Sequence, residues 1–595
     1  MALTGVSCLE TQLKKSDIFV VAGWTTLVTS LLEGGIWVWT RAYPALNAAH
    51  KVTPDVLWFA PILNLAFSFL LCLALLPVVS LLAKKFGART WRGVYGLFLT
   101  LGIYLAITAP QMIHQLGALA MSLGLAIVLC RQLQGREEWM TVRLRRWAWC
   151  VPAILLLVWL GVRAQDRIME FDRSGALPAS DPKAPNVLIL MMDTVRADRF
   201  LPHRAQSLTP NFDRLAAAGV RFDNAWSTTS WSLPSQISIL TGLYPHEHEG
   251  DWPTVKMSQR YPTLPELFLQ RGYVTGAFSG NAAWVTPEYM GRGFLRFRVY
   301  ILEDLFRRTT LGRKFDKLLE KVGYHSAGRG KKAPQVNSEF IQFLQDYPER
   351  PFFAYLCYMD VNQEMHESRM NQHRPMPQVV KDYDAALTRL DARIGEMLAA
   401  LQKLGRLENT LIIITSDHGE SFGQKDTEDH DPAGHGSSLY REQSAVPLAV
   451  YYPGRIPAGL TSMRTVSIRE IPATIMDLLG WKNSPFTGES LSRAWQPPDS
   501  MDAANPAVFA ELRHLDGKEI QASAFHDAWQ FLDTPRDFQQ LKKGEELFDL
   551  SVDAMSKTNL TDQPLAQPVL TELRERLRVF HNSSKQKSAS SKAAP

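Results

Sequence analysis

Hydrophobic residues gather in five long stretches within the first 163 residues. Each stretch approaches the roughly 20 apolar residues that an α-helix needs to cross a bilayer. No small-residue cleavage pattern follows the first stretch, which argues against a cleaved signal peptide. The pattern predicts an all-α transmembrane bundle of about five helices over residues 1–163, with a buried soluble helix as the alternative for the two shortest stretches. The stretches are residues 18–39, 57–83, 93–109, 112–130 and 147–162.

Lysine and arginine are concentrated in every second connection between these stretches. Connections rich in these residues stay in the cytoplasm. Five crossings that begin inside predict a multi-pass protein of a bacterial cytoplasmic (inner) membrane, with the rest of the chain extracytoplasmic. A solvated protein face is the alternative for any one cluster. The clusters are Lys14 and Lys15; Lys84, Lys85, Arg89 and Arg92; and Arg131, Arg136, Arg143, Arg145 and Arg146.

The rest of the chain alternates short apolar runs with longer amphipathic stretches. A continuous apolar run that ends at a polar residue is typical of a strand buried on both faces. Strands that alternate with helices predict an α/β fold with a mostly parallel central sheet. The predicted strands are residues 186–192, 274–278, 352–359, 410–415 and 446–452, and the predicted helices include 264–270, 336–345 and 380–404.

Changes in composition suggest the domain boundaries. A single core stops growing near about 250–300 residues, so a chain of 595 residues needs more than one unit. Mixed charge followed by turn formers predicts a juxtamembrane stalk at residues 164–184. The α/β domain is expected over residues 185–500, with a C-terminal subdomain over 501–582. Residues 583–595 are rich in Ser, Lys and Ala without apolar periodicity, which predicts a disordered tail.

Charge and cysteine content exclude several classes of partner. The formal net charge of +5 comes from residues 1–175, which carry +7, whereas the remainder carries −2. A nucleic-acid partner is therefore not expected, because such a partner requires positive charge on the folded domain. Cys357 is the only cysteine beyond the apolar region, so the α/β domain can form neither an internal disulfide nor a thiolate zinc cluster.

Polar residues follow two of the predicted strands. Asp193 comes directly after the strand at 186–192, and Asp417 and His418 follow the strand at 410–415. Ligands gather at the carboxyl ends of parallel strands. Two carboxylates and an imidazole delivered to one edge suit a divalent cation with oxygen and nitrogen ligands. A helix cap is the ordinary alternative for an aspartate in this position.

A serine stands at the expected start of a short helix. Pro234 and Gly242 bracket this helix, and Ser232 precedes the proline. The positive end of the helix and a nearby metal can acidify a hydroxyl, which makes a weak nucleophile useful. The alternative is that Ser232 or Ser235 serves only as an N-cap.

Together these motifs resemble the sulfatase family of the alkaline-phosphatase-like superfamily. The resemblance covers about residues 185–560 and implies an alkaline-phosphatase-like sandwich. The membrane bundle followed by an exported domain also resembles the phosphoethanolamine and glycerol-phosphate transferases of bacterial envelopes, in the same superfamily. The motifs are PNVLILMMDTVRAD, SWSLPSQISILTGLYPHEHEG, TLIIITSDHGESFG, GHGSSLYREQSAVPL, VSIREIPATIMDLLG and, near the end, ELFDL.

The resemblance implies roles for particular residues. One divalent ion is expected on Asp193, Asp417 and His418, with Ser232 as a further ligand and as the nucleophile. Ligand types do not separate Ca, Zn, Mn and Mg, although the histidine favours zinc or manganese. The catalytic set is completed by His435, expected to protonate the leaving group, and by Arg196, which steadies a nonbridging oxygen or forms a structural ion pair.

The chain also departs from the family pattern. Sulfatases oxidise a Cys or Ser to formylglycine, and Gln236 stands where the family's arginine supports that modification, which argues against formylglycine at Ser232. A Gly-Lys-Trp-His motif that binds sulfate has only residues 280–284 as its counterpart. Where many relatives have Asp-x-His, residues 360–362 are Asp-Val-Asn, which disfavours a second metal.

The sequence therefore predicts a membrane-anchored, metal-dependent hydrolase of sulfuric or phosphoric esters. Expected partners are lipid of the cytoplasmic membrane and, as substrate, a sulfated or phosphorylated glycan, lipid or small ester. The alternative is a phospho-alcohol transferase that decorates envelope lipid or glycan through a covalent Ser232 intermediate. A third hypothesis is an envelope scaffold that has lost the chemistry. Segments expected to set specificity are residues 294–332 and 421–434.

Overall fold

A computed structural model shows two compact units, which we describe separately. The first contains Met1–Phe171 and Ile301–Ser326, and the second contains Asp172–Tyr300 and Ala327–Pro595. The structure describes residues 14–41, 53–110, 113–181, 183–201, 206–321, 330–370, 375–423, 434–495, 506–535 and 543–592.

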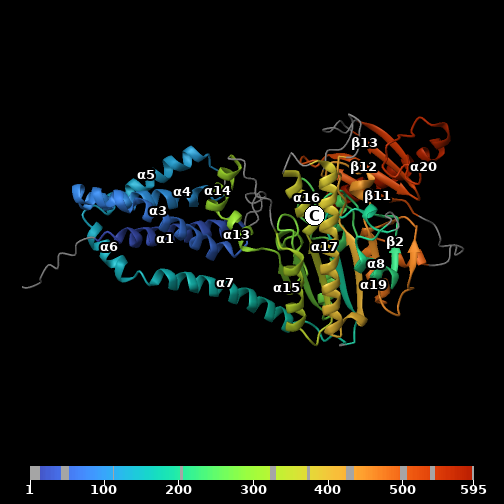
Figure 1. The fold of residues 1–595 in the computed structure, drawn as a ribbon, viewed down its shortest axis with the longest axis horizontal. Helices are drawn as coiled ribbons and strands as arrows, with labels where there is room; N and C mark the ends of the chain where they lie inside the picture. Colours follow the sequence, from blue (N-terminus) through green and yellow to red (C-terminus); the bar gives the residue numbers. More distant parts are fainter. Residues whose placement is uncertain are drawn as a thin grey trace, which may run out of the picture. The chain divides into compact units, whose positions relative to one another are not determined.

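The first unit is entirely helical in its described part (Figure 1). Each predicted apolar stretch corresponds to one long helix. Four helices are long and apolar enough to cross a membrane, and a fifth span is obtained only if α6 and α7, bent by 56°, count together. The helices are α1 (Asp17–Arg41), α3 (Val56–Phe86), α4 (Ala88–Thr108), α5 (Gln115–Gln132), α6 (Glu137–Arg146), α7 (Cys150–Gly175), α13 (Leu302–Arg308) and α14 (Thr310–Lys321). Because α7 continues to Gly175, the first half of the predicted stalk is helical.

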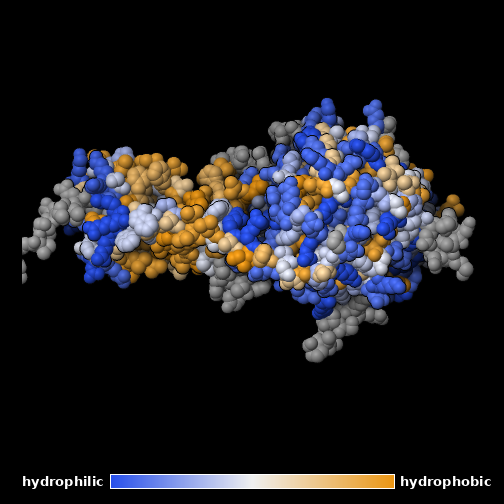
Figure 2. Space-filling view, turned by 90° about the horizontal axis from the view of Figure 1, so that it is seen from below, coloured by the Kyte–Doolittle hydropathy of each residue, from blue (hydrophilic) through white to orange (hydrophobic). Residues whose placement is uncertain are grey.

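The surface of this helical unit is apolar and part of its interior is polar. Large side chains such as Leu70, Leu81 and Leu116 are 64%, 69% and 71% exposed, and hydrophobic surface dominates these helices in Figure 2. Inside, the buried Asn64 donates hydrogen bonds to Ser30 (2.9 Å) and to Glu33 (3.0 Å). An apolar exterior around hydrogen-bonded polar groups suits a lipid solvent.

The segment expected to be a specificity loop instead contains regular structure. Residues 294–332 include strand β5 (Arg296–Arg298) and the two helices α13 and α14. Residues 301–326 belong to the helical unit, although their neighbours in sequence belong to the other unit. The sequence of α14, TLGRKFDKLLEK, is strongly amphipathic, and its period of 3.6 residues was the available signal. Of the other expected specificity segment, residues 424–433 lie outside the described residues.

The second unit is built on an eight-stranded sheet with the order β5-β4-β6-β1-β7-β8-β2-β9. All pairs are parallel except those made by β8. The mostly parallel sheet is therefore confirmed, and β1, whose seven residues are all buried, lies near its centre between β6 and β7. The strands are β1 (Asn186–Met192), β2 (Val220–Phe222), β4 (Val274–Ser279), β5, β6 (Phe352–Tyr358), β7 (Thr410–Ser416), β8 (Leu448–Tyr451) and β9 (Leu460–Ser462).

Helices cover both faces of this sheet, and a separate hydrophobic core lies under each layer. One core takes most of its helical residues from α8 (Pro210–Ala217), α15 (Ala333–Asp346) and α17 (Met376–Lys403). The other takes them from α9 (Ser232–Thr241), α11 (Leu264–Gln270) and α19 (Ile471–Leu478). This layered α/β architecture agrees with the predicted fold class. Shorter helices are α10 (Pro245–His248), α12 (Pro287–Met290), α16 (Asp360–Met370) and α18 (Arg441–Ser444).

The C-terminal part adds a four-stranded antiparallel sheet, β11-β12-β13-β14, on which helix α20 packs through Leu570, Leu573 and Leu577. Helix α20 continues to Lys592, into the segment for which the sequence predicted disorder. Ala, Lys and Gln are good helix formers, and extending an existing helix avoids the cost of nucleation. The bounds are β11 (Val508–Arg513), β12 (Glu519–His526), β13 (Trp529–Thr534), β14 (Gly544–Asp549) and α20 (Gln567–Lys592), with a small parallel pair of β3 (Ala225–Trp226) and β10 (Val466–Ser467).

Candidate active site

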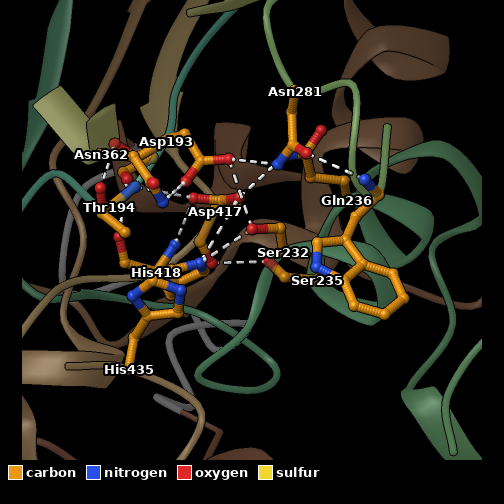
Figure 3. A network of polar contacts seen from close by, with 12 residues as sticks. Asp193, Thr194, Ser232, Ser235, Gln236, Asn281, Asn362, Asp417, His418 and His435 are labelled. Carbon is orange, nitrogen blue, oxygen red and sulfur yellow. Dashed lines mark hydrogen bonds and ion pairs between the residues drawn. The ribbon is translucent and has the colours of Figure 1, made fainter. Parts of the chain in front are cut away.

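The two central strands deliver acidic residues to one point. Met192 and Ser416 are partners at the ends of β1 and β7, so the next residues, Asp193 and Asp417, emerge side by side. Both aspartates and His418 are fully buried, and one ligand atom from each lies within 4.8 Å of the others (Figure 3). The structure thus brings together the three residues that the sequence singled out as metal ligands.

Among the described residues, no lysine or arginine forms an ion pair with either carboxylate, and the titratable groups of opposite sign near them are His418 and His435. Asp193 accepts hydrogen bonds from the amides of Asn281 (2.9 Å) and Asn362 (2.7 Å). Burial, together with the nearby charge of Asp417, raises the pKa of Asp193 to about 8. Buried anions require a compensating cation, and carboxylate oxygens with an imidazole nitrogen suit a divalent metal ion. The residues present therefore fit the metal that the fold implies.

Backbone groups complete the surroundings of Asp417. Its Oδ1 accepts from the N–H groups of Thr194 (3.2 Å) and His418 (2.9 Å). Thr194 adopts a φ of 61°, an uncommon value for a β-branched residue that is typical of functional sites. Gly419 follows His418, and a Cβ there would lie 2.0 Å from the carbonyl oxygen of Glu442. Only glycine fits that position, which explains the Asp-His-Gly sequence.

Ser232 is the first residue of α9 and lies beside this cluster (Figure 3). Its Oγ is 3.1 Å from Nε2 of His418 and 3.3 Å from Oδ2 of Asp193. Nδ1 of His418 is 2.8 Å from the carbonyl oxygen of Gly419, which can only accept, so Nδ1 carries the proton of the neutral ring. Nε2 then presents its lone pair to the Ser232 hydroxyl. The expected helix is present, and Gly242 ends it in a left-handed conformation.

Gln236 occupies the position where the family has arginine. Its amide nitrogen donates to Oδ2 of Asp417 (2.7 Å), and its amide oxygen accepts from the hydroxyl of Tyr355 (2.7 Å). Gln236 therefore supports the same carboxylate that an arginine could, but without adding a positive charge. From the sequence, Gln236 is only an argument against formylglycine at Ser232. In the structure it contacts a predicted metal ligand, Asp417.

The remaining two predicted catalytic residues have different surroundings. The ring of His435 lies 4.5 Å from that of His418, and its Nδ1 is 3.0 Å from Oε2 of Glu420. The guanidinium of Arg196 is buried and forms a two-point ion pair with Asp198, at 2.9 and 2.8 Å. The pairing of Arg196 favours the structural ion pair over contact with a substrate oxygen.

Asn281 is a site residue that the sequence did not single out. It follows β4, and Asn362 lies in α16, just after β6. The strands β4, β6, β1 and β7 are consecutive in the sheet, so their carboxyl ends share one edge. Applying the strand-end rule to every predicted strand, rather than to the two most acidic ones, would have found Asn281.

The start of α9 is held by a neutral buried histidine, which gives a testable pH dependence. His248 accepts from Gly250 N at Nδ1 (3.0 Å), so Nε2 donates to the carbonyl oxygen of Pro234 (3.1 Å). Burial lowers the pKa of His248 from 6.5 to about 3. Between these values the unfolded chain binds the extra proton, so this group's contribution to stability is lost as the pH falls below about 6.5.

We therefore expect the thermal midpoint of wild type to fall more steeply between pH 6.5 and 4.5 than that of His248→Gln. Each pH unit in this window corresponds to about 1.4 kcal/mol for one group. Glutamine can keep both hydrogen bonds without titrating. Asp251, whose pKa burial raises to about 7, acts in the opposite direction but is present in both proteins. Parallel slopes by fluorescence-monitored melting would contradict this assignment.

Comparison with known proteins agrees with this geometry. Residues 185–481 match the family model for sulfatases. This part of the chain belongs to the sulfatase family. The sulfatase domain confirms both the predicted resemblance and the expected enzyme class, that of sulfuric ester hydrolases.

Individual relatives are distant in sequence but similar over most of their length. An N-acetylglucosamine-6-O-sulfatase of Bacteroides thetaiotaomicron is 23% identical over 505 residues, covering 66% of this chain and 89% of that protein. An arylsulfatase of Clostridium perfringens is 24% identical over 459 residues, covering 63% and 90%. Among solved structures, phosphonate monoester hydrolase of Agrobacterium radiobacter has a TM-score of 0.51 at 19% identity, covering 67% of this chain and 96% of that one. The structural likeness concerns the fold of the sulfatase domain.

Proposed function

We propose that this protein is a membrane-anchored, metal-dependent sulfatase that hydrolyses sulfate esters of glycans outside the cytoplasmic membrane. The observation that carries the proposal is the position of the Ser232 hydroxyl between Nε2 of His418 and the carboxylate of Asp193. A nucleophilic hydroxyl and three metal ligands then share one buried point, as metal-assisted ester hydrolysis requires.

The residues of the chain have separable tasks in this reaction. Asp193, Asp417 and His418 would hold the metal. When bound, the metal supplies a Lewis acid that polarises the ester and favours loss of the nucleophile's proton. The N-terminal end of α9 directs its partial positive charge toward the anionic ester. Nδ1 of His435 is 3.0 Å from Oε2 of Glu420, which orients the ring, and a proton carried on its Nε2 could be donated to the leaving oxygen.

Aromatic side chains beside the nucleophile support a sugar substrate. Trp231 directly precedes Ser232, stacks on Trp252 at a ring distance of 5.7 Å, and meets the edge of Trp284 at 5.2 Å. Trp252 and Trp284 are partly exposed. Their broad rings offer apolar faces with a polar edge, which suits the faces of a sugar ring. The relative from Bacteroides thetaiotaomicron, named for a sulfated amino sugar, agrees with this substrate class.

Contacts within the helical unit support the proposed orientation. Helix α14, whose sequence neighbours belong to the catalytic unit, contacts the end of α4 through a hydrogen bond from Arg313 to the carbonyl oxygen of Ala109 (3.3 Å). Residues of α14 share a cavity with the N-terminal end of α5, whereas the arginine-rich connection at residues 131–146 follows the C-terminal end of α5. If that connection is cytoplasmic, the end of the helical unit that bears α14 faces outward, and the chain continues from α14 into the catalytic unit on that side.

Phosphoryl transfer is the second candidate, favoured by Gln236, which stands where the arginine that supports modification of the serine is expected. In this reaction the Oγ–P bond forms as the P–O bond to the donor's alcohol breaks, and that alcohol takes the proton. An acceptor alcohol then attacks the phosphoserine and regenerates Ser232.

Mass spectrometry of the peptide containing Ser232, combined with metal analysis and turnover assays, tests these alternatives. For the sulfatase we expect one divalent ion per chain, hydrolysis of a sulfated amino sugar, and formylglycine at position 232, seen as the loss of two hydrogens or as its hydrate. A phosphoethanolamine ester on Ser232 after incubation with phosphatidylethanolamine, with release of diacylglycerol and without sulfate release, would establish the transferase instead. A chain that binds no divalent ion and releases neither product would contradict both and favour the scaffold.

A further inference from the structure

Helix α14 presents three cations on one side. Lys317 is four residues from Arg313 and three from Lys314, and residues at these spacings are neighbours on a helix surface. Phe315 and Leu318, in the same helix, are 49% and 58% exposed. A helix with both basic residues and exposed large apolar residues is typical of a membrane surface.

These cations line a cavity of about 420 Å³ within the helical unit. The other wall is formed by the end of α4 and the start of α5. A cavity of this size is large enough for a small charged group with its attached glycerol or sugar. Its lining residues are Thr108, Ile113, His114, Gln115, Leu116, Thr310, Arg313, Lys314 and Lys317.

The cations are held in place without a carboxylate ion pair. Arg313 donates to the carbonyl oxygens of Arg308 (3.0 Å) and Ala109 (3.3 Å), and its guanidinium lies 4.7 Å from the ring centre of Trp37. Nζ of Lys314 is 3.2 Å from the hydroxyl of Tyr104. Within the described part of the chain, no carboxylate lies within ion-pair distance of Arg313, Lys314 or Lys317.

The charge of this cavity is positive at neutral pH, because its three cations outnumber the nearby buried carboxylate of Glu33, which accepts a hydrogen bond from the backbone N–H of Thr310 (3.2 Å). Burial lowers the pKa of Arg313 to about 10, which leaves it protonated under these conditions. The N-terminus of α5 adds to the field, because His114 is its N-cap and Gln115 and Leu116 open the helix. The first backbone N–H groups of a helix favour an anion. Three cations and a helix N-terminus thus converge on one cavity.

We propose that this cavity binds the phosphate of an anionic lipid headgroup. The site is built from the ends of apolar helices, and its lining includes Leu116, which is 71% exposed, and Ile113, which is 39% exposed. Together with Phe315 and Leu318, these side chains provide apolar surface for acyl chains next to the charges. A soluble phosphate would use the cations but would leave this apolar surface in water.

The inference rests on the membrane anchorage in the proposed function, but not on the reaction at Ser232. A bound lipid would fix the insertion at residues 301–326 to the bilayer surface. The cavity and the active site are separate, because none of the cavity residues belongs to the group formed by Asp193, Asp417 and His418.

Lipid binding can be measured on the full-length protein, delipidated in nonionic detergent, by native mass spectrometry. Dioleoyl phosphatidylglycerol is titrated against dioleoyl phosphatidylcholine, and inorganic phosphate and glycerol 1-phosphate are added as competitors. We expect phosphatidylglycerol to bind preferentially and the Lys314→Gln/Lys317→Gln variant to bind it about 30-fold more weakly, since each lysine contributes about fivefold.

Lys321→Gln is the matched control, because Lys321 is exposed on the same helix but does not line the cavity. This variant should bind phosphatidylglycerol within about twofold of wild type. Equal affinity for the two lipids, equal loss in both variants, or displacement of the lipid by stoichiometric inorganic phosphate would overturn the proposal. Ester hydrolysis assayed on the same samples reports separately on the active site, so failure of one proposal is not mistaken for failure of the other.

Discussion

Replacing Ser232 with alanine is expected to lower kcat/KM for ester cleavage by at least about 10³-fold, because it removes the group that forms the covalent bond. The same loss is expected for hydrolysis and for transfer, since both reactions need an oxygen at this position. Metal content should remain near that of wild type, because Asp193, Asp417 and His418 are unchanged. Steady-state kinetics and metal analysis of one preparation measure both quantities.

Ser238→Ala is the matched control for this variant. Ser238 lies in the same helix, is fully buried, and hydrogen-bonds to the carbonyl oxygen of Pro234 (3.0 Å) and to Thr228 (2.9 Å). Its loss should cost about 1 kcal/mol of stability and change kcat/KM by less than about threefold. If Ser232→Ala retained wild-type turnover while Ser238→Ala behaved as expected, the assignment of the nucleophile would be wrong.

The parts of the fold that were predictable are those whose local pattern agrees with their environment. Residues 187–192 are all apolar because β1 is buried on both faces, and the observed strand, Asn186–Met192, has the predicted bounds. The long helices of the first unit were predictable for a similar reason, because a helix long enough to cross a membrane is apolar over nearly its whole length. The reversal of β8 within the sheet was not predictable, because an apolar run contains no information about direction.

Three residues that the structure brings together could be found from the sequence, because Asp193, Asp417 and His418 are titratable groups that follow buried strands. Asn281 and Gln236 were visible only as departures from the family's motifs, and their contacts could not be predicted. Their importance depends on contacts across 88 and 181 residues of sequence, to Asp193 and Asp417 respectively. The insertion carrying α14 was missed for another reason: its partners lie in a different unit of the chain.

Replacing Asp417 with asparagine is expected to abolish stoichiometric metal binding and to lower kcat/KM by at least about 10³-fold. The substitution keeps the size of the side chain but removes one of two buried negative charges that a divalent cation would neutralise. A metal acting as a Lewis acid lowers the activation barrier by several kcal/mol, and each 1.4 kcal/mol corresponds to about a tenfold change in rate. Elemental analysis after purification and kinetics at saturating added metal give the two measurements.

The matched control is Asp477→Asn, at an exposed aspartate in α19 of the same domain. This variant should keep both metal and activity. Asp417→Asn also separates the enzyme from the scaffold hypothesis by its effect on stability. If a cation normally occupies the cluster, a chelator should lower the thermal midpoint of wild type but not of Asp417→Asn, because a ligand stabilises only the state that binds it. If no cation binds, the chelator should leave both midpoints unchanged.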